Sequence, residues 1–372
     1  MKLRTLTLFL PLSAAVAAIF SSCAGMGGTR TGPINYIADM GPVYPGIASY
    51  VVMDAYDQHA VLAYRANQRR PVASLTKIAT AVVALDILNS GGIDAGEMMT
   101  VPPQVTLLGG PGPATLQPGD RLSVRDGLYA AMVGSDNYAA ETVAFHLGQT
   151  LMASGIGSNP MAAFVAQMNA LCSKVGLGNT RFANAPGLDL RGRSGYSTAA
   201  DMAKLTAHAL EVPGFSFYCS QPNRRIAIDR AGTRLGVGIR NTNELLGRGS
   251  IDGVKTGTTQ AAGECLIITS PRPSTVVKRP DGSTVVTQHR LIVVVLGTTE
   301  RFGRAWQLLN DGWAGYFQWR AQSVSSLTVP APLDARRPQP QPLPPAPAIP
   351  STPAFPPYPS PPTTVAPPGY YR

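Results

Sequence analysis

The stretch RRPVASLTKIATAVVALDI, residues 69–87, places one serine and one lysine at the start of a long apolar run. Ser74 and Lys77 are three residues apart, and the eight residues that follow Lys77 are all apolar or threonine. Residues three apart lie on one face of a helix, so the pattern predicts a helix over residues 74–90 in which Lys77 leans back toward Ser74. An ammonium group in such a stretch must either reach water or serve a reaction that needs a desolvated amine.

The sequence on either side of this helix indicates strands at both ends of a globular region, with helices between them. Residues 48–67 alternate around a polar centre, which is typical of a β-hairpin. Apolar residues at intervals of three and four predict further helices over residues 123–133, 138–148, 160–175 and 197–211. Three strand-like runs follow, DGVKTGTT, GECLIITS and HRLIVVVLGTT, with a turn signal, RPDGS, between the last two and an amphipathic helix over residues 301–319. This order predicts an α+β domain in which an antiparallel sheet is flanked by helices and a helical subdomain is inserted.

The segments outside residues 46–320 have the composition of export and linker sequences. A basic start, an apolar stretch and the small residues around Cys23 resemble a bacterial signal peptide with a lipobox. We therefore interpret residues 1–23 as a signal peptide whose Cys23 is lipidated, with ordinary cleavage as the alternative, and residues 24–45 as a linker. Residues 329–372 hold half of the 34 prolines and are predicted to form a disordered tail. The protein is thus expected at the extracytoplasmic face of a membrane in the bacterial envelope.

Charge and potential metal ligands exclude several classes of protein. The formal net charge is +10, but the basic residues are dispersed without a Lys/Arg-rich block, so we predict no nucleic-acid partner. The four histidines have no ligand spacing, and neither a metal nor a cofactor is predicted. Cys172, Cys219 and Cys265 are expected to be buried free thiols, with one disulfide as the alternative.

Three short motifs follow one another along the chain: Ser74-Leu75-Thr76-Lys77, Ser135-Asp136-Asn137 and Lys255-Thr256-Gly257. At average residue usage, the patterns Ser-x-x-Lys and Ser-x-Asn each occur about once by chance in a chain of this length. Lys-Thr-Gly is rarer, with roughly one chance occurrence in ten such chains. The ordered set of three is therefore a specific signal.

The chemistry of a serine nucleophile explains the first motif. A serine hydroxyl needs a base within hydrogen-bond reach, and Lys77 can be that base if its pKa is lowered. The apolar run would lower the pKa by desolvation, and Lys255 would lower it by repulsion. Ser74 near a helix N-terminus also places backbone N–H groups beside a carbonyl under attack.

The other two motifs supply groups around the reacting bond. Ser135, in a loop between two predicted helices, can pass a proton to the leaving amine, and Asn137 can bind a substrate amide. Lys255 and Thr256 lie at the start of a predicted strand, where Gly257 lets the substrate backbone approach closely. The N–H of Thr258 is a candidate oxyanion donor, and its hydroxyl is a candidate ligand for a carboxylate.

With these motifs the sequence resembles the serine-type D-alanyl-D-alanine carboxypeptidases, low-molecular-mass penicillin-binding proteins with the β-lactamase/transpeptidase-like fold. The likeness extends to GLGNTRFANAPGLD, YSTAADMAKL and NTNELLG and covers roughly residues 46–320. It implies that Ser74 is the acyl-ester nucleophile, Lys77 the proton acceptor and Ser135 the second active-site serine. It further implies that substrate is bound by Asn137, Lys255, Thr256, Gly257 and Thr258.

The resemblance implies an enzyme that removes the terminal D-alanine from peptidoglycan stem pentapeptides and is acylated by penicillins. Thr242 stands where some relatives have an arginine, and the proline-rich tail stands where many have a second domain and an anchoring helix. Anchoring would then depend on Cys23. The alternatives are a D,D-endopeptidase acting on crosslinks, a class A-like β-lactamase and a non-catalytic penicillin-binding envelope protein. No glutamate occurs from Thr142 to Leu210, where the deacylating glutamate of a class A β-lactamase is expected.

Overall fold

The computed structural model describes residues 36–190, 194–279 and 281–325. The predicted signal peptide with Cys23, most of the predicted linker and the predicted tail from residue 329 lie outside these residues. The described end of the predicted linker packs against the domain: Met40 forms a β-bridge with Ala63, and Tyr44 is buried.

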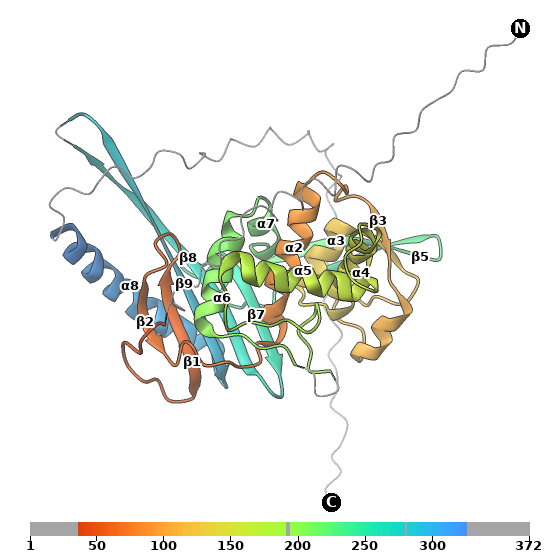
Figure 1. Ribbon diagram of the computed structural model, residues 1–372, viewed down its shortest axis with the longest axis horizontal. Coiled ribbons are helices and arrows are strands. Elements are labelled where there is room, and N and C mark those ends of the chain that lie inside the picture. The colour runs from red at the N-terminus through yellow and green to blue at the C-terminus, as the bar shows by residue number, and fades with distance from the viewer. Residues whose placement is uncertain (1–35, 191–193, 280, 326–372) are drawn as a thin grey trace, which may run out of the picture. The chain divides into compact units, whose positions relative to one another are not determined.

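The central sheet has five antiparallel strands in the order β2-β1-β9-β8-β7 (Figure 1). The strands are β1 (Ile47–Asp54), β2 (Ala60–Tyr64), β7 (Gly253–Thr259), β8 (Gly263–Lys278) and β9 (Thr284–Thr298). The first hairpin and the last three strands meet where β1 pairs with β9, for example at Tyr50 and Val295. The prediction of one antiparallel sheet built from both ends of the chain is therefore confirmed.

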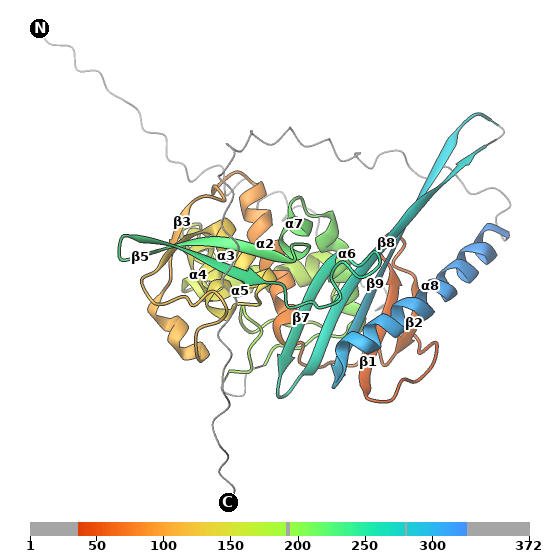
Figure 2. The ribbon, with the colours of Figure 1, turned by 180° about the vertical axis from the view of Figure 1, so that it is seen from behind.

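The two faces of this sheet are covered by different parts of the chain. Helix α8 (Arg301–Ser325) packs its Leu308 and Tyr316 against Val52 and Val293 on one face. The neighbouring residues Val51 and Val294 point to the opposite face and join the core beneath α2 and α6. Figure 2 shows α8 in front of the sheet and the other helices behind it. Coverage on both faces explains why the run LIVVVL in β9 is entirely apolar.

Helix α2 (Lys77–Asn89) runs through the helical part, and its first nine residues are all buried. Around it lie α3 (Val124–Val133), α4 (Asn137–Ala153), α5 (Pro160–Val175) and α6 (Ala199–Glu211), as predicted, and a short α7 (Phe215–Cys219). Each of the four longer helices begins after an N-cap whose side chain accepts a backbone N–H three residues on: Ser123, Asp136, Asn159 and Thr198.

The inserted part also contains a four-stranded sheet that the sequence analysis did not predict. Its strands are β3 (Met98–Thr100), β4 (Arg121–Ser123), β5 (Asn223–Arg230) and β6 (Thr233–Arg240), in that order, and a 3₁₀ turn, η2 (Pro103–Leu108), follows β3. Strands β5 and β6 form a hairpin whose inner face presents Ile226, Ile228 and Ile239 to the core. In the view of Figure 2, the β5–β6 hairpin lies in front of α3.

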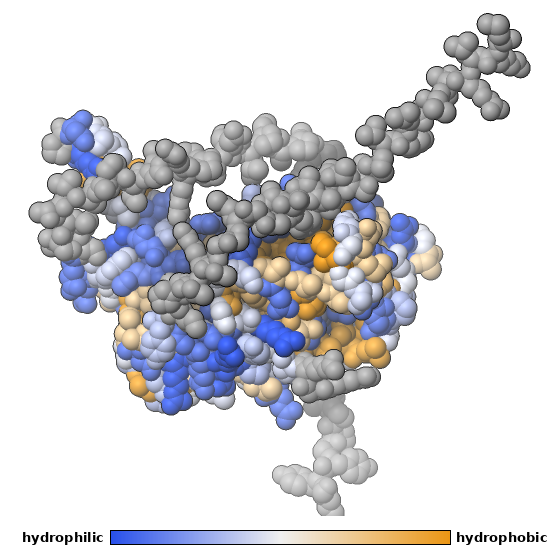
Figure 3. Space-filling view, in the orientation of Figure 1, coloured by the Kyte–Doolittle hydropathy of each residue, from blue (hydrophilic) through white to orange (hydrophobic). Residues whose placement is uncertain are grey.

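Strands β8 and β9 continue beyond their neighbours as a two-stranded ribbon that projects from the sheet (Figure 1). The predicted turn closes it, with Gly282 N–H donating to Arg279 O. On the face of the molecule in Figure 3, hydrophilic surface predominates around β1 and β2, whereas hydrophobic surface is concentrated over the helical part. Cys172, Cys219 and Cys265 are buried and free, as expected. Within the described ranges, no helix combines the length and the apolar character needed to cross a membrane.

Candidate active site

Ser74 lies in a 3₁₀ turn, η1 (Ala73–Thr76), that leads directly into α2. The predicted helix therefore starts three residues later than residue 74, because Ala73 adopts a left-handed φ of 48° and directs the chain into the turn. Lys77 is the first residue of α2, and its Nζ lies 2.9 Å from Ser74 Oγ. Ser74 is partly exposed, whereas Lys77 is fully buried, so the pair presents a hydroxyl to solvent and hides its amine.

The amine of Lys77 has two further acceptors. Its Nζ donates to Asn137 Oδ1 at 2.7 Å and to the carbonyl oxygen of Pro186 at 2.9 Å. Burial lowers the pKa of Lys77 to about 7, against an opposing contribution from the charge of Asp136. A neutral amine keeps two N–H groups for Asn137 and Pro186, so its lone pair is left to face Ser74 Oγ. The geometry thus favours proton transfer from Ser74 to Lys77.

The second motif occupies the loop between α3 and α4. Ser135 is partly exposed and has a φ of 59°, a left-handed conformation that is uncommon for a side-chain-bearing residue. Asp136 is fully buried and holds this loop: it caps α4 at Ala139 N–H and accepts Ala114 N–H through its other oxygen. The loop therefore fixes Asn137 against Lys77, and Ser135 lies two residues before Asn137 in the same loop.

The third motif lies within β7, which packs against η1. A Cβ built on Gly257 would lie 3.0 Å from Ser74 N and 3.1 Å from Val72 O. Sequence reasoning assigned this glycine to close approach of a substrate. The structure shows that it first allows β7 to approach the turn that carries the nucleophile.

Lys255 points into the interior beside Lys77 and is 1% exposed. Its Nζ donates to Thr256 O at 3.0 Å. Burial lowers the pKa of Lys255 well below its usual range, and repulsion from Lys77 and Arg301 adds to the effect. The sequence analysis expected Lys255 to lower the pKa of Lys77 by repulsion. In the structure the repulsion contributes to the lowered pKa of Lys255, whereas burial is what lowers the pKa of Lys77.

Two groups beside β7 were not among the predicted site residues. Thr242 Oγ1 lies 2.6 Å from Thr256 Oγ1, which fixes the hydroxyl of the motif. On the exposed edge, Arg301 Nη1 donates to Thr258 Oγ1 at 2.7 Å and to Gly257 O at 3.1 Å. The sequence analysis placed Arg301 at the start of a predicted helix but assigned it no role, because it belongs to none of the three motifs. A positive group therefore stands at the same strand end as the predicted carboxylate ligand Thr258.

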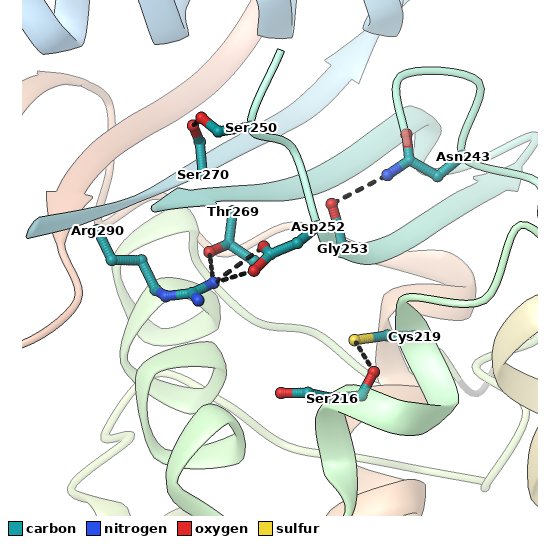
Figure 4. A network of polar contacts seen from close by, with 9 residues as sticks. All are labelled: Ser216, Cys219, Asn243, Ser250, Asp252, Gly253, Thr269, Ser270 and Arg290. Carbon is teal, nitrogen blue, oxygen red and sulfur yellow. Dashed lines mark hydrogen bonds and ion pairs between the residues drawn. The ribbon is translucent and has the colours of Figure 1, made fainter. Parts of the chain in front are cut away.

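Polar contacts behind the site hold the start of β7 in place (Figure 4). Asn243 Nδ2 donates to Gly253 O at 3.0 Å, and Arg290 Nη1 donates to Asp252 at 2.8 Å and to Thr269 Oγ1 at 2.8 Å. These bonds fix the strand on both sides, so Lys255 and Thr256 are held without any contribution from a ligand.

The assembled groups are suited to nucleophilic catalysis. The structure brings together Ser74, Lys77, Asn137 and the β7 motif, and it places Ser135 in the adjoining loop. Among the described residues no cluster of metal-ligating side chains was found. A serine beside a buried amine of lowered pKa is the arrangement that attack on an acyl carbon requires.

Comparison with known protein families gives a match over most of the globular region. The profile described as D-alanyl-D-alanine carboxypeptidase matches residues 46–299. The chain is 32% identical to a D-alanyl-D-alanine endopeptidase of Pseudomonas aeruginosa, over 53% of this chain and 58% of that protein. It is 30% identical to the D-alanyl-D-alanine carboxypeptidase DacD of Salmonella typhimurium, over 76% of this chain and 64% of that protein. The chain thus spans about three fifths of the length of these relatives.

Solved structures show the same fold. Penicillin-binding protein D2 from Listeria monocytogenes in the cefotaxime-bound form has a TM-score of 0.58 and 26% identity, covering 74% of this chain and 100% of that one. The Streptomyces K15 DD-transpeptidase has a TM-score of 0.61 and 25% identity, covering 75% of this chain and 100% of that one. The predicted β-lactamase/transpeptidase-like fold is therefore confirmed.

Proposed function

The chain belongs to the D-alanyl-D-alanine carboxypeptidase family, and from this premise we propose that it removes the terminal D-alanine from peptidoglycan stem pentapeptides. The observation that carries the proposal is the set of three oxygen atoms within hydrogen-bond distance of Lys77 Nζ, on Ser74, Asn137 and Pro186. Together they orient an amine whose pKa is about 7 so that it can take the proton of Ser74 Oγ.

In the first half of the reaction, Lys77 accepts the Ser74 proton while Oγ bonds to the carbonyl carbon between the two D-alanines. The backbone N–H groups of Ser74 and Thr258 are the proposed donors to the resulting oxyanion, and the close approach of β7 to Ser74 N supports this pairing. The C–N bond then breaks. The proton held by Lys77 passes through the Ser135 hydroxyl to the leaving D-alanine, which completes the acyl-enzyme.

In the second half, water gives one proton to Lys77 as its oxygen bonds to the acyl carbon. The bond to Ser74 Oγ breaks, and Oγ recovers the proton from Lys77. Lys77 thus serves as the base in both halves of the reaction. At the end of the cycle, Ser74 and Lys77 have returned to their initial protonation states.

Substrate binding is assigned to the strand edge. The proposed site pairs Asn137 with a substrate amide, and Lys255, Thr256 and Thr258 with the terminal carboxylate. We add Arg301 to this set, because its guanidinium donates to Thr258 Oγ1 at the exposed edge of the strand. Lys255, in contrast, is buried. Arg301 thereby supplies the charge that Thr242 does not supply at the position where some relatives have an arginine.

Incubation of the purified protein with a muropeptide pentapeptide, followed by mass spectrometry, tests the activity. We expect loss of one alanine residue from the wild type and no change with Ser74→Ala. Fluorescent penicillin should label the wild type and not the variant. Labelling of Ser74→Ala at the wild-type level would refute the assignment of the nucleophile.

A D,D-endopeptidase is the second candidate, because one of the two sequence relatives described above carries that name. The same chemistry applies, and only the substrate differs. Crosslinked muropeptide dimers cleaved faster than pentapeptide would favour the endopeptidase.

We further propose that the protein is anchored in the envelope through a lipid on Cys23. The support is the sequence pattern around this residue. Detergent-phase partitioning of the protein from its host tests the anchor. Equal partitioning of the wild type and Cys23→Ser would place it elsewhere.

A further inference from the structure

The outer face of the β5–β6 hairpin carries a set of arginines that the reaction does not use. Strand alternation and the pairing of Arg225 with Gly238 and of Asp229 with Arg234 place these residues on one face. Arg121 of β4 pairs with Asp229 and continues the same face. We call Arg121, Arg225, Arg234 and Arg240 the basic ribbon; all four are exposed, and Asp229 is the acidic residue among them.

On the inner face of the same hairpin, isoleucines are buried and the arginines have partners within the protein, with Arg224 lying over the ring of Tyr129. Ile226, Ile228 and Ile239 are buried there. The inner Arg230 bonds through two nitrogens to the carboxylate of Asp120, which neutralises it. Arg121, Arg234 and Arg240, in contrast, point outward and are exposed.

The surface between the arginines is flat. Gly236 and Gly238 of β6 stand on the outer face, and Arg225 lies across Gly236, where an added Cβ would meet its Nε at 2.5 Å. The two eight-residue strands give the surface a length of about 25 Å. An extended polymer can therefore lie along it close to the backbone, with cationic groups at its sides.

The ribbon ends at the rim of the active site. Arg240 is the last residue of β6, and two residues later Thr242 bonds to Thr256 of the β7 motif. The N–H of Thr242 also donates to Val133 O, beside the loop of Ser135. A chain that enters the site at β7 has the basic ribbon directly beside it.

We propose that the basic ribbon binds the carboxylate groups of neighbouring stem peptides on the same peptidoglycan polymer while one stem peptide occupies the active site. This inference rests on the proposed function for its substrate. Each uncleaved stem peptide ends in a carboxylate, so a polymer of them is a polyanion. Four arginines facing one aspartate attract such a polymer and raise its local concentration at the site.

The test compares two variants that each remove two exposed positive charges. Arg234→Gln/Arg240→Gln alters the ribbon and spares Arg225, which packs on the backbone. Lys278→Gln/Arg279→Gln, at the tip of the β8–β9 hairpin, is the matched control far from the site (Figure 2). The full chain is measured for co-sedimentation with purified peptidoglycan sacculi, and for release of D-alanine from sacculi and from a soluble pentapeptide.

At low ionic strength the ribbon variant should bind sacculi about tenfold more weakly than the wild type and release D-alanine from them correspondingly more slowly. Its rate on the soluble pentapeptide should stay within about twofold of the wild type, and the control should match the wild type throughout. Salt at 0.5 M should bring all three proteins to the same weak binding. Amidation of the sacculus carboxylates should do the same.

Equal weakening in the control would reduce the effect to net charge, and equal loss on the soluble peptide would place it in the active site; either outcome overturns the inference. So would full binding to amidated sacculi, because it would show that carboxylates are not recognised. A failure of the proposed function would be distinguishable from a failure of this inference. If the proposed function is wrong, the wild type would release no D-alanine from the soluble pentapeptide. Co-sedimentation with sacculi would still measure whether the basic ribbon binds them.

Discussion

The start of α2 and the middle of β7 each bury one lysine at the candidate active site, and the surroundings of the two lysines differ. Lys77 Nζ lies within hydrogen-bond distance of three oxygen atoms, on Ser74, Asn137 and Pro186. Lys255 Nζ donates to the carbonyl oxygen of its neighbour Thr256. Both amines have lowered pKa values for the same leading reason, which is burial.

The difference separates two uses of a buried amine. A lysine whose hydrogen-bonding positions are filled by the protein can gain or lose a proton without moving, as a general base must. A lysine with donor capacity left over stabilises its charge only when an anion arrives. The comparison therefore assigns proton transfer to Lys77 and carboxylate binding to Lys255, and the following experiments test that division.

The largest effect is expected from Lys77→Met. Methionine has nearly the length of lysine and suits the apolar surroundings, but it cannot accept a proton. The acylation rate with penicillin should fall by at least about 10³-fold, because the base and the orientation of Ser74 are lost together. The melting temperature should change little, because removal of a buried amine is favourable and offsets the hydrogen bonds that Asn137 and Pro186 lose. Stopped-flow acylation and thermal unfolding of both proteins measure the two quantities.

A lysine with a purely structural role would give the opposite result. The variant would then lose stability through Asn137 and Pro186, whose oxygens lose their donor, and acylation of the folded fraction would stay near the wild-type rate. Lys174→Met, at an exposed position of α5, is the matched control and should alter neither quantity.

The pH dependence of acylation should be the next largest effect. The pKa of Lys77 is lowered to about 7, so the amine is mostly protonated and inactive as a base at pH 5 and mostly neutral at pH 8. The rate should rise with pH, by about 100-fold between pH 5 and pH 8, and level off above pH 8. A series of penicillin acylation rates from pH 5 to pH 9 is the measurement. A rate that is flat over this range would remove Lys77 from the role of base.

Lys255→Met should weaken binding more than chemistry. Loss of one charge-assisted hydrogen bond to a carboxylate corresponds to roughly 30-fold in affinity. The limiting acylation rate should change less, and the midpoint of the pH profile should stay near 7, because burial is the leading cause of the lowered pKa of Lys77. Acylation rates at several penicillin concentrations and pH values separate these quantities. A midpoint that moves upward by more than about one pH unit would show that the two lysines act as one coupled base.

Much of the fold followed from apolar periodicity. The helices from α2 to α6 and the strands at both ends were predicted because each carries a continuous stripe or run of buried residues. The second sheet was missed although β5 and β6 alternate, because Gly236 and Gly238 dilute the pattern and arginines fill the outer positions. Strands β3 and β4 have three residues each, too few for any periodicity to show.

The site was predictable where its residues belong to a short motif and not where they act from a distance. The spacing of Ser74 and Lys77 implies their contact through helix geometry alone. The Pro186 carbonyl contributes a backbone atom that any residue would offer, and Arg301 reaches Thr258 only because the start of α8 follows the last strand of the sheet. The exact start of α2 could not be predicted, because Ala73 before it adopts a left-handed conformation that alanine does not favour.

The smallest expected effect is proton uptake when a carboxylate binds. The pKa of Lys255 lies well below its usual range in the free protein, and an anion beside the amine should raise it again. The binding of D-alanyl-D-alanine peptide to the Ser74→Ala variant should therefore take up a fraction of one proton. Calorimetry in two buffers of different ionisation enthalpy measures this number. Uptake should vanish when Lys255→Met is added, whereas Arg301→Lys should keep it, because that variant retains Lys255. Equal proton uptake with and without Lys255 would show that another group takes up the proton. It would also contradict the assignment of carboxylate binding to Lys255 and of proton transfer to Lys77.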